Sequence, residues 1–424
     1  MNLLDISSAC VKCGKCIPSC TIYGISKDEA QSPRGFLDLI AAHKNGDLKL
    51  NKDLKKIFES CFLCTNCVEA CPSSLRVDSA IEQIRFDINK KIGIAWYKKL
   101  AFFLLSNRKI MDIVAKFGYI FQSCAFHIQD SESKNEGMRA KFSLPMIKKD
   151  RLLISLSKKS FLNSNKDFID NGGDESIGFF VGCLANYSYT NTAQSVLDIA
   201  KELKINVDLM KAQSCCGAPQ YFTGDFKRVE VLAKKNMEYF EKKLESLKAI
   251  IIPEATCSAM IRIDYEHFFN SINENEWAKR AKKISSKIFI ATKYFYDFTP
   301  LKEYLLKKSK KSLLVTYHDP CHAKKMQAYY KEARELLNTS YTFKELSDTN
   351  SCCGFGGVSM QSEYYDKSLQ VGLKRAKQID ESMADIVSSE CSACRMQLSN
   401  SLHQISSKVI FKNPLELIAK ALTS

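Results

Sequence analysis

The chain has 424 residues, of which 45% are hydrophobic and 26% are charged, so it can bury two or three ordinary globular cores. Its 62 basic and 47 acidic residues give a net charge of +15, which points toward nucleic acid or an anionic membrane surface as a partner. The lysines are spread over stretches with helical spacing, as on a solvated surface, and this pattern argues against nucleic acid.

Eighteen cysteines are many for a chain whose first residues lack the basic and apolar segments of a signal peptide. In a reducing compartment, so many thiols indicate metal binding rather than disulfides. No apolar run approaches the roughly 18 residues that a membrane span requires. We therefore expect a cytoplasmic protein that does not cross a bilayer.

Residues 1–92 hold eight cysteines in two runs, each with the spacing Cys-x2-Cys-x2-Cys-x3-Cys, and Pro72 follows the second run. Three cysteines spaced in this way can wrap a loop around three corners of a [4Fe–4S] cubane while backbone N–H groups point at its sulfides. Between the runs we predict helices over Gly35–His43 and Asp53–Glu59, where small ferredoxins have β-hairpins.

The last cysteine of each run is expected to ligate the opposite cluster, as in two-cluster ferredoxins, because it starts the segment that leads away. The predicted ligands of the first [4Fe–4S] cluster are Cys10, Cys13, Cys16 and Cys71, and those of the second are Cys61, Cys64, Cys67 and Cys20. Zinc also favours Cys-x2-Cys pairs, but it does not require a regular third cysteine. Four thiolate-bound clusters, at about −2 each when oxidised, would remove roughly half of the excess positive charge.

Residues 93–176 separate the cysteine-rich parts of the chain and hold one cysteine, Cys124, which we expect to be a buried, inert thiol. Trp96–Phe121 combines aromatic and basic residues with helical spacing. This pattern fits a helix on an anionic membrane surface, and it equally fits an amphipathic helix packed on the cluster domain. The composition of Gln129–Glu175 is that of a loop or linker.

Residues 177–311 and 312–424 are an internal duplication in which strands alternate with helices. The predicted strands are Ile177–Leu184 and Ala249–Ile252 in the first copy, and Ser312–Tyr317 and Asp385–Val387 in the second. The predicted helices are Asn191–Leu203 and Asp225–Leu247 in the first copy, and Lys324–Leu337 and Glu363–Ile379 in the second. This alternation predicts parallel α/β sheets, arranged as two units or as one merged pair.

Each copy places a lone cysteine after a strand, a Cys-Cys-Gly in a loop, and a further cysteine at a helix start. Strand ends and helix N-termini gather ligands in parallel α/β folds, and the helix dipole lowers the thiol pKa. The candidate ligands are Cys183, Cys215, Cys216 and Cys257 in the first copy, and Cys321, Cys352, Cys353, Cys391 and Cys394 in the second. One or two further iron–sulfur clusters are therefore predicted, with zinc left open as an alternative.

The cysteine pattern of the copies resembles the CCG domain of heterodisulfide reductase and its relatives. In that family, a five-cysteine motif holds a noncubane [4Fe–4S] cluster. The resemblance implies such a cluster in the second copy, which has all five cysteines. The first copy departs from the motif, with Met260 where the fifth cysteine is expected, which leaves cluster type and occupancy open there.

The whole chain resembles the iron–sulfur subunit of glycolate oxidase and its D-lactate dehydrogenase relatives, including the segment Ser32-Pro33-Arg34-Gly35 between the runs. The C-terminal half is also similar to the iron–sulfur subunit of anaerobic glycerol-3-phosphate dehydrogenase, through Phe179–Cys183, Tyr317–His322 and Glu390–Cys394. These resemblances imply an α+β multidomain protein. Its N-terminal α-helical two-cluster ferredoxin domain is followed by duplicated α/β CCG domains.

The resemblances also imply an iron–sulfur electron-transfer subunit of an oxidoreductase complex. An FAD-binding dehydrogenase subunit would oxidise glycolate or D-lactate, and this chain would relay electrons toward quinone at the inner face of the cell membrane, with a membrane subunit as a further candidate partner. The alternatives are the iron–sulfur subunit of anaerobic glycerol-3-phosphate dehydrogenase and a heterodisulfide reductase-like thiol–disulfide reductase.

No flavin or nicotinamide fingerprint is recognisable in the chain, so we predict no catalytic residue in it. His318 and His322 flank Cys321 and could tune or ligate a cluster. We expect both side chains to hydrogen-bond nearby backbone instead.

Overall fold

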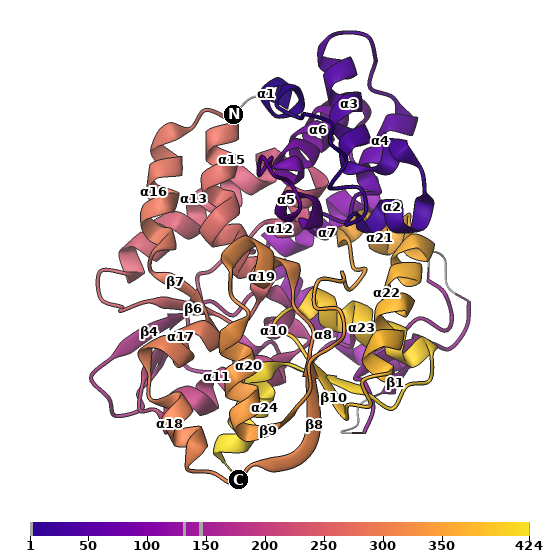
Figure 1. Cartoon of the computed structure of the whole chain (residues 1–424). Coiled ribbons are helices and arrows are strands. Elements are labelled where there is room, and N and C mark those ends of the chain that lie inside the picture. Colours follow the sequence, from indigo (N-terminus) through magenta and orange to yellow (C-terminus); the bar gives the residue numbers. More distant parts are fainter. Residues whose placement is uncertain (1–2, 130–132, 144–146, 424) are drawn as a thin grey trace.

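The computed structural model describes residues 3–129, 133–143 and 147–423. Figure 1 shows the N-terminal helices (indigo) at the upper right, beside helices of the first α/β unit (salmon) and above the second unit (orange to yellow). The predicted class, a helical ferredoxin-like part followed by duplicated α/β CCG domains, is confirmed.

The N-terminal part consists of short helices around an apolar core that includes Phe36, Ile40, Phe58 and Ile84. Its helices are α1 (Leu3–Ser8), α2 (Thr21–Ser26), α3 (Pro33–Lys44), α4 (Lys52–Glu59), α5 (Asn66–Glu69) and α6 (Val77–Ile92), with a 3-10 turn at Glu29–Gln31. The two helices that the sequence predicts between the cysteine runs are therefore present as α3 and α4.

The Ser-Pro-Arg-Gly segment starts α3. The hydroxyl of Ser32 accepts a hydrogen bond from the backbone N–H of Gly35 at 3.0 Å, and Pro33 occupies the first turn, where its missing N–H costs nothing. A Cβ atom at Gly35 would lie 2.0 Å from the backbone oxygen of Glu29, so only glycine fits here. The segment thus fixes the turn that brings the first cysteine loop onto α3.

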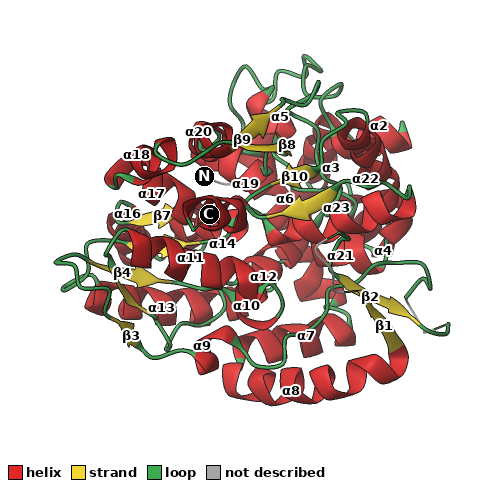
Figure 2. Ribbon diagram, turned by 90° about the horizontal axis from the view of Figure 1, so that it is seen from below, coloured by secondary structure: helices red, strands yellow, loops and turns green. Residues whose placement is uncertain are grey.

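The middle region begins with two helices, α7 (Trp96–Ser106) and α8 (Arg108–Ala125), which lie along one edge of the molecule in Figure 2. After them come an antiparallel pair of strands, β1 (Phe126–Gln129) and β2 (Gly137–Ala140), and the short α9 (Phe161–Ser164). Cys124 is exposed on α8, so the prediction of a buried thiol is wrong. None of the described helices is long and apolar enough to cross a membrane.

The predicted linker is hydrogen-bonded to the second repeat. Arg151 donates to the backbone oxygen of Gln361 at 2.8 Å, and Asn135 donates to that of Val409 at 3.1 Å. The polar composition gave no sign of these contacts, nor of β2 and α9, which lie within the predicted linker.

The first repeat is built on a five-stranded sheet of order β3-β5-β4-β6-β7, in which the pairs are parallel except β3–β5. Its strands are β3 (Phe168–Ile169), β4 (Ser176–Phe179), β5 (Asn206–Asp208), β6 (Ile250–Ile252) and β7 (Ile288–Ile290). Its helices are α10 (Cys183–Tyr187), α11 (Thr190–Glu202), α12 (Ala218–Thr223), α13 (Phe226–Lys243), α14 (Ala255–Ala259), α15 (Tyr265–Ser271), α16 (Asn275–Ser285), α17 (Ala291–Phe298) and α18 (Leu301–Leu306), with a π-helix at Met260–Asp264.

The second repeat has a parallel four-stranded sheet of order β11-β10-β8-β9. This order matches β7-β6-β4-β5 of the first repeat. The strands are β8 (Lys311–Tyr317), β9 (Tyr341–Phe343), β10 (Ile386–Ser388) and β11 (Ile410–Lys412). The helices are α19 (Cys321–Gln327), α20 (Lys331–Ser340), α21 (Gly357–Ser362), α22 (Tyr365–Asp380), α23 (Ser392–Gln404) and α24 (Pro414–Leu422).

The two repeats share one hydrophobic core. Ile177 of the first sheet, Val315 of the second and Ile418 of α24 belong to the same buried cluster, and α24 packs against α11 of the other repeat. Of the two arrangements that the sequence left open, the merged pair is therefore the one observed. The predicted boundaries at residues 92, 176 and 311 stay predictions, since a shared core does not mark a division.

Candidate iron–sulfur centres

The two N-terminal cysteine loops have the same backbone shape. Lys12 and Gly14 in the first loop, and Leu63 and Thr65 in the second, have positive φ angles at matching positions between the cysteines. Left-handed residues of this kind turn successive N–H groups toward the inside of a loop, where they can bind anionic sulfur. In the second loop, the N–H of Leu63 already donates to Sγ of Cys61 at 3.4 Å.

The structure brings the cysteines together in the crosswise sets that the sequence predicts. The electrostatic neighbours of Cys16 are Cys10, Cys71 and Cys13. Cys20, Cys61, Cys64 and Cys67 line a single cavity. Apolar side chains of Phe36 and Val77 complete the wall of this cavity. Clustered thiols, inward N–H groups and an apolar wall fit a cubane, and the ligand assignment itself stays a prediction.

Burial raises the pKa of Cys16, Cys20, Cys61 and Cys67. It raises the pKa of Cys20 to about 12 and that of Cys61 to about 11. Cys64 differs, since a hydrogen bond from Cys352 lowers its pKa to about 5. Because clusters bind thiolates, cluster binding must release the protons of Cys20 and Cys61 at neutral pH.

The five cysteines of the second repeat are all buried and form one continuous group. Side-chain contacts run from Cys321 through Cys352, Cys353 and Cys394 to Cys391. Cys321 starts α19 at the end of β8, and Cys391 is the N-cap of α23. The N–H of Gly354 donates to Sγ of Cys352 at 3.4 Å, so this loop also directs backbone donors at sulfur.

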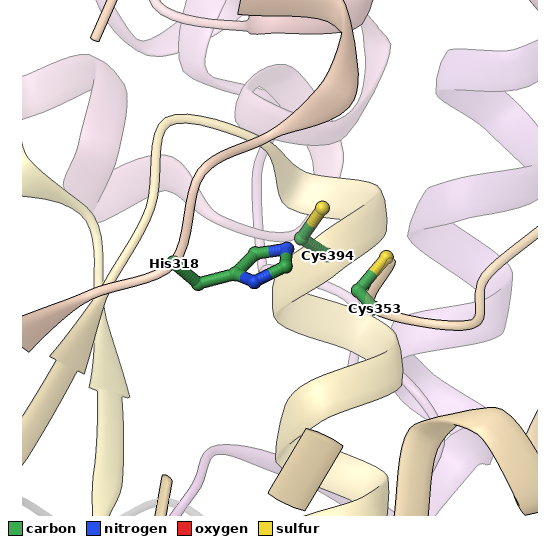
Figure 3. Close-up of side chains that lie close together, drawn as sticks. All are labelled: His318, Cys353 and Cys394. Carbon is green, nitrogen blue, oxygen red and sulfur yellow. The ribbon is translucent and has the colours of Figure 1, made fainter. Parts of the chain in front are cut away.

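His318 lies against this group, as Figure 3 shows: a ring nitrogen and the sulfur atoms of Cys353 and Cys394 lie within 4.8 Å of one another. Nε of Arg375 donates to Nδ1 of His318 at 3.1 Å. Nε2 has no hydrogen-bond partner among the described residues. Burial lowers the pKa of His318, so the ring is neutral, and with Nδ1 accepting, its proton sits on Nε2.

This geometry places the unpartnered Nε2 N–H of His318 near the sulfur atoms of Cys353 and Cys394. Its side chain bonds Arg375 and faces Cys353, so the expectation of a backbone partner is wrong. His322 also departs from that expectation: its Nδ1 lies 3.5 Å from the hydroxyl of Thr256, and its ring stacks on Phe222. His318 follows the end of β8 and His322 lies in the first turn of α19, and neighbouring elements cover both.

The four cysteines of the first repeat also converge. Sγ of Cys216 lies 3.2 Å from Sγ of Cys257, and contacts continue from Cys216 to Cys215 and from Cys215 to Cys183. Cys183 is partly exposed, and the other three are buried. Four thiols around one point suit either an iron–sulfur cluster or zinc.

Strand register shows which ligand the first repeat lacks. Gly178 and Thr316 lie the same number of residues before the lone cysteines Cys183 and Cys321, so they are equivalent. Gly178 pairs with Ile250, and Thr316 pairs with Val387. Cys257 therefore corresponds to Cys394. The residue that corresponds to Cys391 is Glu254.

The helix starts give the same equivalence. Glu254 is the N-cap of α14, with φ −125° and ψ 119°, and Cys391 is the N-cap of α23, with φ −133° and ψ 116°. The prediction that Met260 stands at the missing ligand position is thus wrong. It arose because spacing in the sequence aligned Cys257 with Cys391, which put Met260 opposite Cys394. Met260 instead lies in the hydrophobic core, at the start of the π-helix.

Glu254 connects the two repeats. Its buried carboxylate accepts hydrogen bonds from the backbone N–H of Ser392, at 2.9 Å, and from the Ser392 hydroxyl. These bonds satisfy the start of α23 directly beside Cys391. Burial raises the pKa of Glu254 to about 7.

Three of the cysteine groups neighbour one another. Cys64 of the second ferredoxin loop contacts Cys352 of the second repeat, and Thr256, next to Cys257, has its hydroxyl 3.4 Å from Sγ of Cys391. Lys325 reaches across the first of these contacts, donating to Oδ1 of Asn66. Although burial favours a neutral amine, the neighbouring cysteine charges raise the pKa of Lys325.

Arg375, Lys325, Thr256 and Glu254 are the site residues that the sequence analysis did not predict. These residues lie in helices or, for Glu254, at a helix N-cap, and none belongs to a cysteine motif. The sequence therefore gave no pattern that marked them. Glu254 follows strand β6, and Glu390 follows the equivalent strand β10. This repetition was the signal in the sequence that could have drawn attention to Glu254.

Comparison with protein families finds two models that together match more than half of the chain. The model described as "4Fe-4S dicluster domain" matches residues 6–75. The model described as "Cysteine-rich domain" (CCG) matches twice, at residues 177–262 and 315–399. These segments contain the cysteine groups described above.

Among curated proteins, the chain is 27% identical over 362 residues to the probable glycolate oxidase iron–sulfur subunit of Bacillus subtilis, covering 82% of this chain and 79% of that one. It is 25% identical over 399 residues to a subunit of the fumarate reductase (CoM/CoB) of Methanothermobacter marburgensis, covering 93% and 68%. It is 27% identical over 257 residues to a subunit of the anaerobic glycerol-3-phosphate dehydrogenase of Escherichia coli K12, covering 58% and 59%.

The fold, the cysteine groups and the family matches define an iron–sulfur protein that joins a dicluster ferredoxin-like domain to two CCG domains. The chain is related to the iron–sulfur subunits of the glycolate oxidase and lactate utilization type, and to a subunit of anaerobic glycerol-3-phosphate dehydrogenase. Its role is that of an electron-transfer subunit associated with an oxidoreductase complex.

Proposed function

We propose that this chain relays electrons in a flavoprotein dehydrogenase complex of the glycolate- or D-lactate-oxidising type. The observation that carries the proposal is the proximity of three cysteine groups: Cys64 neighbours Cys352, and Thr256, next to Cys257, lies 3.4 Å from Sγ of Cys391. Iron–sulfur clusters supply one-electron redox chemistry when bound, and closely spaced sites suit such carriers.

The proposed ligands of the two [4Fe–4S] clusters are the crosswise sets of the ferredoxin loops. For the second repeat we propose a further cluster of noncubane type, since all five cysteines of the motif converge there. The first repeat offers four thiols, with Glu254 at the fifth position. There we propose a distinct centre, either an iron–sulfur cluster or zinc.

The proposed partners are an FAD-binding dehydrogenase subunit, which carries out the oxidation, and quinone or a membrane subunit as acceptor at the inner face of the cell membrane. Support comes from the absence of a flavin or nicotinamide fingerprint in the sequence and from relatives that are themselves named as subunits. Glycerol 3-phosphate is the alternative substrate of the complex.

The test is substrate-driven reduction. The cluster-loaded chain is purified anaerobically with the flavoprotein that copurifies, and glycolate, D-lactate or glycerol 3-phosphate is added while EPR follows the clusters. We expect glycolate or D-lactate to reduce the clusters, and only when the flavoprotein is present. Reduction by glycerol 3-phosphate alone would assign the complex to the other family, and reduction by none of the three would contradict the proposal.

A second candidate function is disulfide reduction at the second repeat. A cleft of about 600 Å³ lies between the ferredoxin loops and this repeat, and Cys20 and Cys352 line it together with Lys374 and Arg375. A small anionic disulfide could reach Cys352 through this cleft. Turnover of disulfides by the reduced chain without any flavoprotein would favour this function over the first.

A further inference from the structure

The helices α7 and α8 present a continuous stripe of large apolar side chains to solvent. We call this stripe the apolar face. Its members are Trp96, Leu100 and Phe103 on α7, and Ile110, Ile113, Val114, Phe117, Ile120 and Phe121 on α8. Trp96 is 74% exposed and Phe121 is 61% exposed. The two helices lie along the edge of the molecule, and no other described element covers them from outside in Figure 2.

The opposite side of α8, which faces the protein, is polar or small. Arg108 donates to the backbone oxygen of Lys211, Asp112 accepts from the hydroxyl of Tyr187 at 2.8 Å, and Gln122 donates to the backbone oxygen of Leu156 at 3.2 Å. Gly118 allows Leu156 to approach closely. An ordinary surface helix turns its apolar stripe inward, so α8 has the reverse orientation.

A stripe of this size needs an occupant, because soluble surfaces rarely expose so many contiguous large apolar side chains. The sequence pattern left open whether these helices pack on the cluster domain or face a membrane. α7 packs on the ferredoxin part and on the second repeat through buried Lys98, which pairs with Glu59 and Glu363. The inner side of α8 meets the first repeat through Arg108 and Met111, and the apolar face lies on its outer side.

The charges around the apolar face identify the occupant. Lys99, Lys109 and Lys116 are exposed on the same two helices, whose single acidic residue, Asp112, is bonded inward. A groove of about 310 Å³ beside α8 is lined by Lys116 together with Lys158 and Lys159 of the neighbouring loop. Aromatic side chains flanked by lysines are the composition that binds the interface of anionic bilayers, where phosphate groups meet the lysines.

The apolar face also lies over a cysteine group. Leu105, Arg108 and Met111 of α7 and α8 line the same cavity as Cys183 and Cys215 of the first repeat. A surface bound to the apolar face would therefore lie next to the first-repeat centre. The second ferredoxin loop neighbours the second repeat through Cys64 and Cys352.

We propose that the apolar face docks in the plane of an anionic lipid bilayer and places the first-repeat cysteine group nearest to the membrane. The direction of electron flow that this placement suggests, from the ferredoxin loops toward a membrane acceptor, rests on the proposed function. Lipid binding itself does not, since it needs neither substrate nor partner.

The experiment measures cosedimentation of the full, cluster-loaded chain with vesicles of phosphatidylglycerol and phosphatidylcholine, and with vesicles of phosphatidylcholine alone. The variant F117S/F121S alters two exposed positions of the apolar face, and V231S/L306S alters two equally exposed apolar positions elsewhere. We expect F117S/F121S to lower the bound fraction at least tenfold and V231S/L306S to bind like the unaltered chain. The variant K116E/K158E should lose the preference for anionic vesicles.

Cluster content and circular dichroism verify that each variant is folded, which is expected because all altered apolar positions are exposed. The proposal is overturned if the unaltered chain does not bind anionic vesicles, or if F117S/F121S binds as well as V231S/L306S. A change of oligomeric state in F117S/F121S without loss of vesicle binding would instead make the face an interface between copies. If the substrates failed to reduce the clusters in solution, in the presence of the flavoprotein and without vesicles, the proposed function alone would be refuted. Lipid binding would be unaffected by that result.

Discussion

At the scale of single residues, the side chains that surround the cysteines determine how each sulfur is held. Arg375 is always charged, is almost fully buried, and donates to His318. This bond leaves His318 with one available N–H, and the sulfur atoms of Cys353 and Cys394 are next to it. Hydrogen bonds to sulfur stabilise the more negative, reduced form of a cluster. We therefore expect the N–H of His318 to raise the reduction potential of the cluster proposed for the second repeat.

Replacing His318 by leucine should keep the cluster of the second repeat and lower its reduction potential. An N–H bond worth about 1 kcal/mol corresponds to a shift of roughly 40 mV for a one-electron couple. His318→Gln, whose amide can still donate, should recover part of this shift. EPR-monitored redox titration gives the potentials, and loss of iron in His318→Leu would show that the ring is a ligand instead.

Removal of the Glu254 carboxylate should destabilise the start of α23. Glu254→Ala leaves the N–H of Ser392 without its partner, which costs about 1–3 kcal/mol for a buried donor. Glu254→Gln retains an accepting oxygen and should lose less. Urea unfolding measures the change, and the EPR signal of the second-repeat cluster should shift in Glu254→Ala because Cys391 adjoins the altered bond. An unchanged signal with unchanged stability would show that the carboxylate does not position Cys391.

At the scale of elements, each ferredoxin loop is predicted to give its last cysteine to the cluster of the other loop. Cys20 ends the first run, is the N-cap of α2 and shares a cavity with the second run. Cys71 ends the second run, and its charge acts on Cys16 of the first. The exchange follows from chain direction, because the last cysteine of each run leads away from its own loop.

Serine variants test this exchange. Cys20→Ser should lose the same EPR signal as Cys61→Ser, and Cys71→Ser should lose the same signal as Cys10→Ser. Each should bind about four iron atoms fewer, the content of one cubane. Cys124→Ser, which alters an exposed cysteine outside the groups, should keep every signal. If Cys20→Ser matched Cys10→Ser, each run would hold its own cluster.

The sequence predicted those elements whose pattern repeats locally. The cysteine spacing predicted which thiols meet in the ferredoxin loops, and helices such as α13 appeared within a few residues of their bounds. The three-residue strands β5, β7, β9 and β11 were missed, whereas β6 and β10, which are equally short, were recognised because each leads into a cysteine of the repeated pattern. The Glu254 equivalence was missed because it depends on strand pairing. The exposed stripe of α8 could not be assigned, since periodicity does not reveal which face packs inward.

At the scale of the whole molecule, Arg85 of α6 fastens the ferredoxin part to the first repeat. It is buried, and it donates to the backbone oxygens of Phe58 and Cys61 at the second cysteine loop. It also donates to the backbone oxygen of Phe222 in α12 at 2.7 Å. One guanidinium therefore holds both the loop that carries Cys61 and the element that follows the first-repeat Cys-Cys-Gly.

Arg85→Met should loosen this attachment while the apolar stem of the side chain still packs. The three carbonyl groups lose a charged donor, so we expect at least about 3 kcal/mol of destabilisation in urea unfolding. Arg228→Met, which removes a partly exposed arginine paired with Asp225 on α13, should cost less than about 1 kcal/mol. Freeze-quench EPR should show slower electron exchange between the ferredoxin clusters and the second-repeat cluster in Arg85→Met, because the Cys64–Cys352 contact depends on the position of this loop. Unchanged exchange in a clearly destabilised Arg85→Met would mean that the second repeat alone, through Lys325 and Asn66, holds the two sites together.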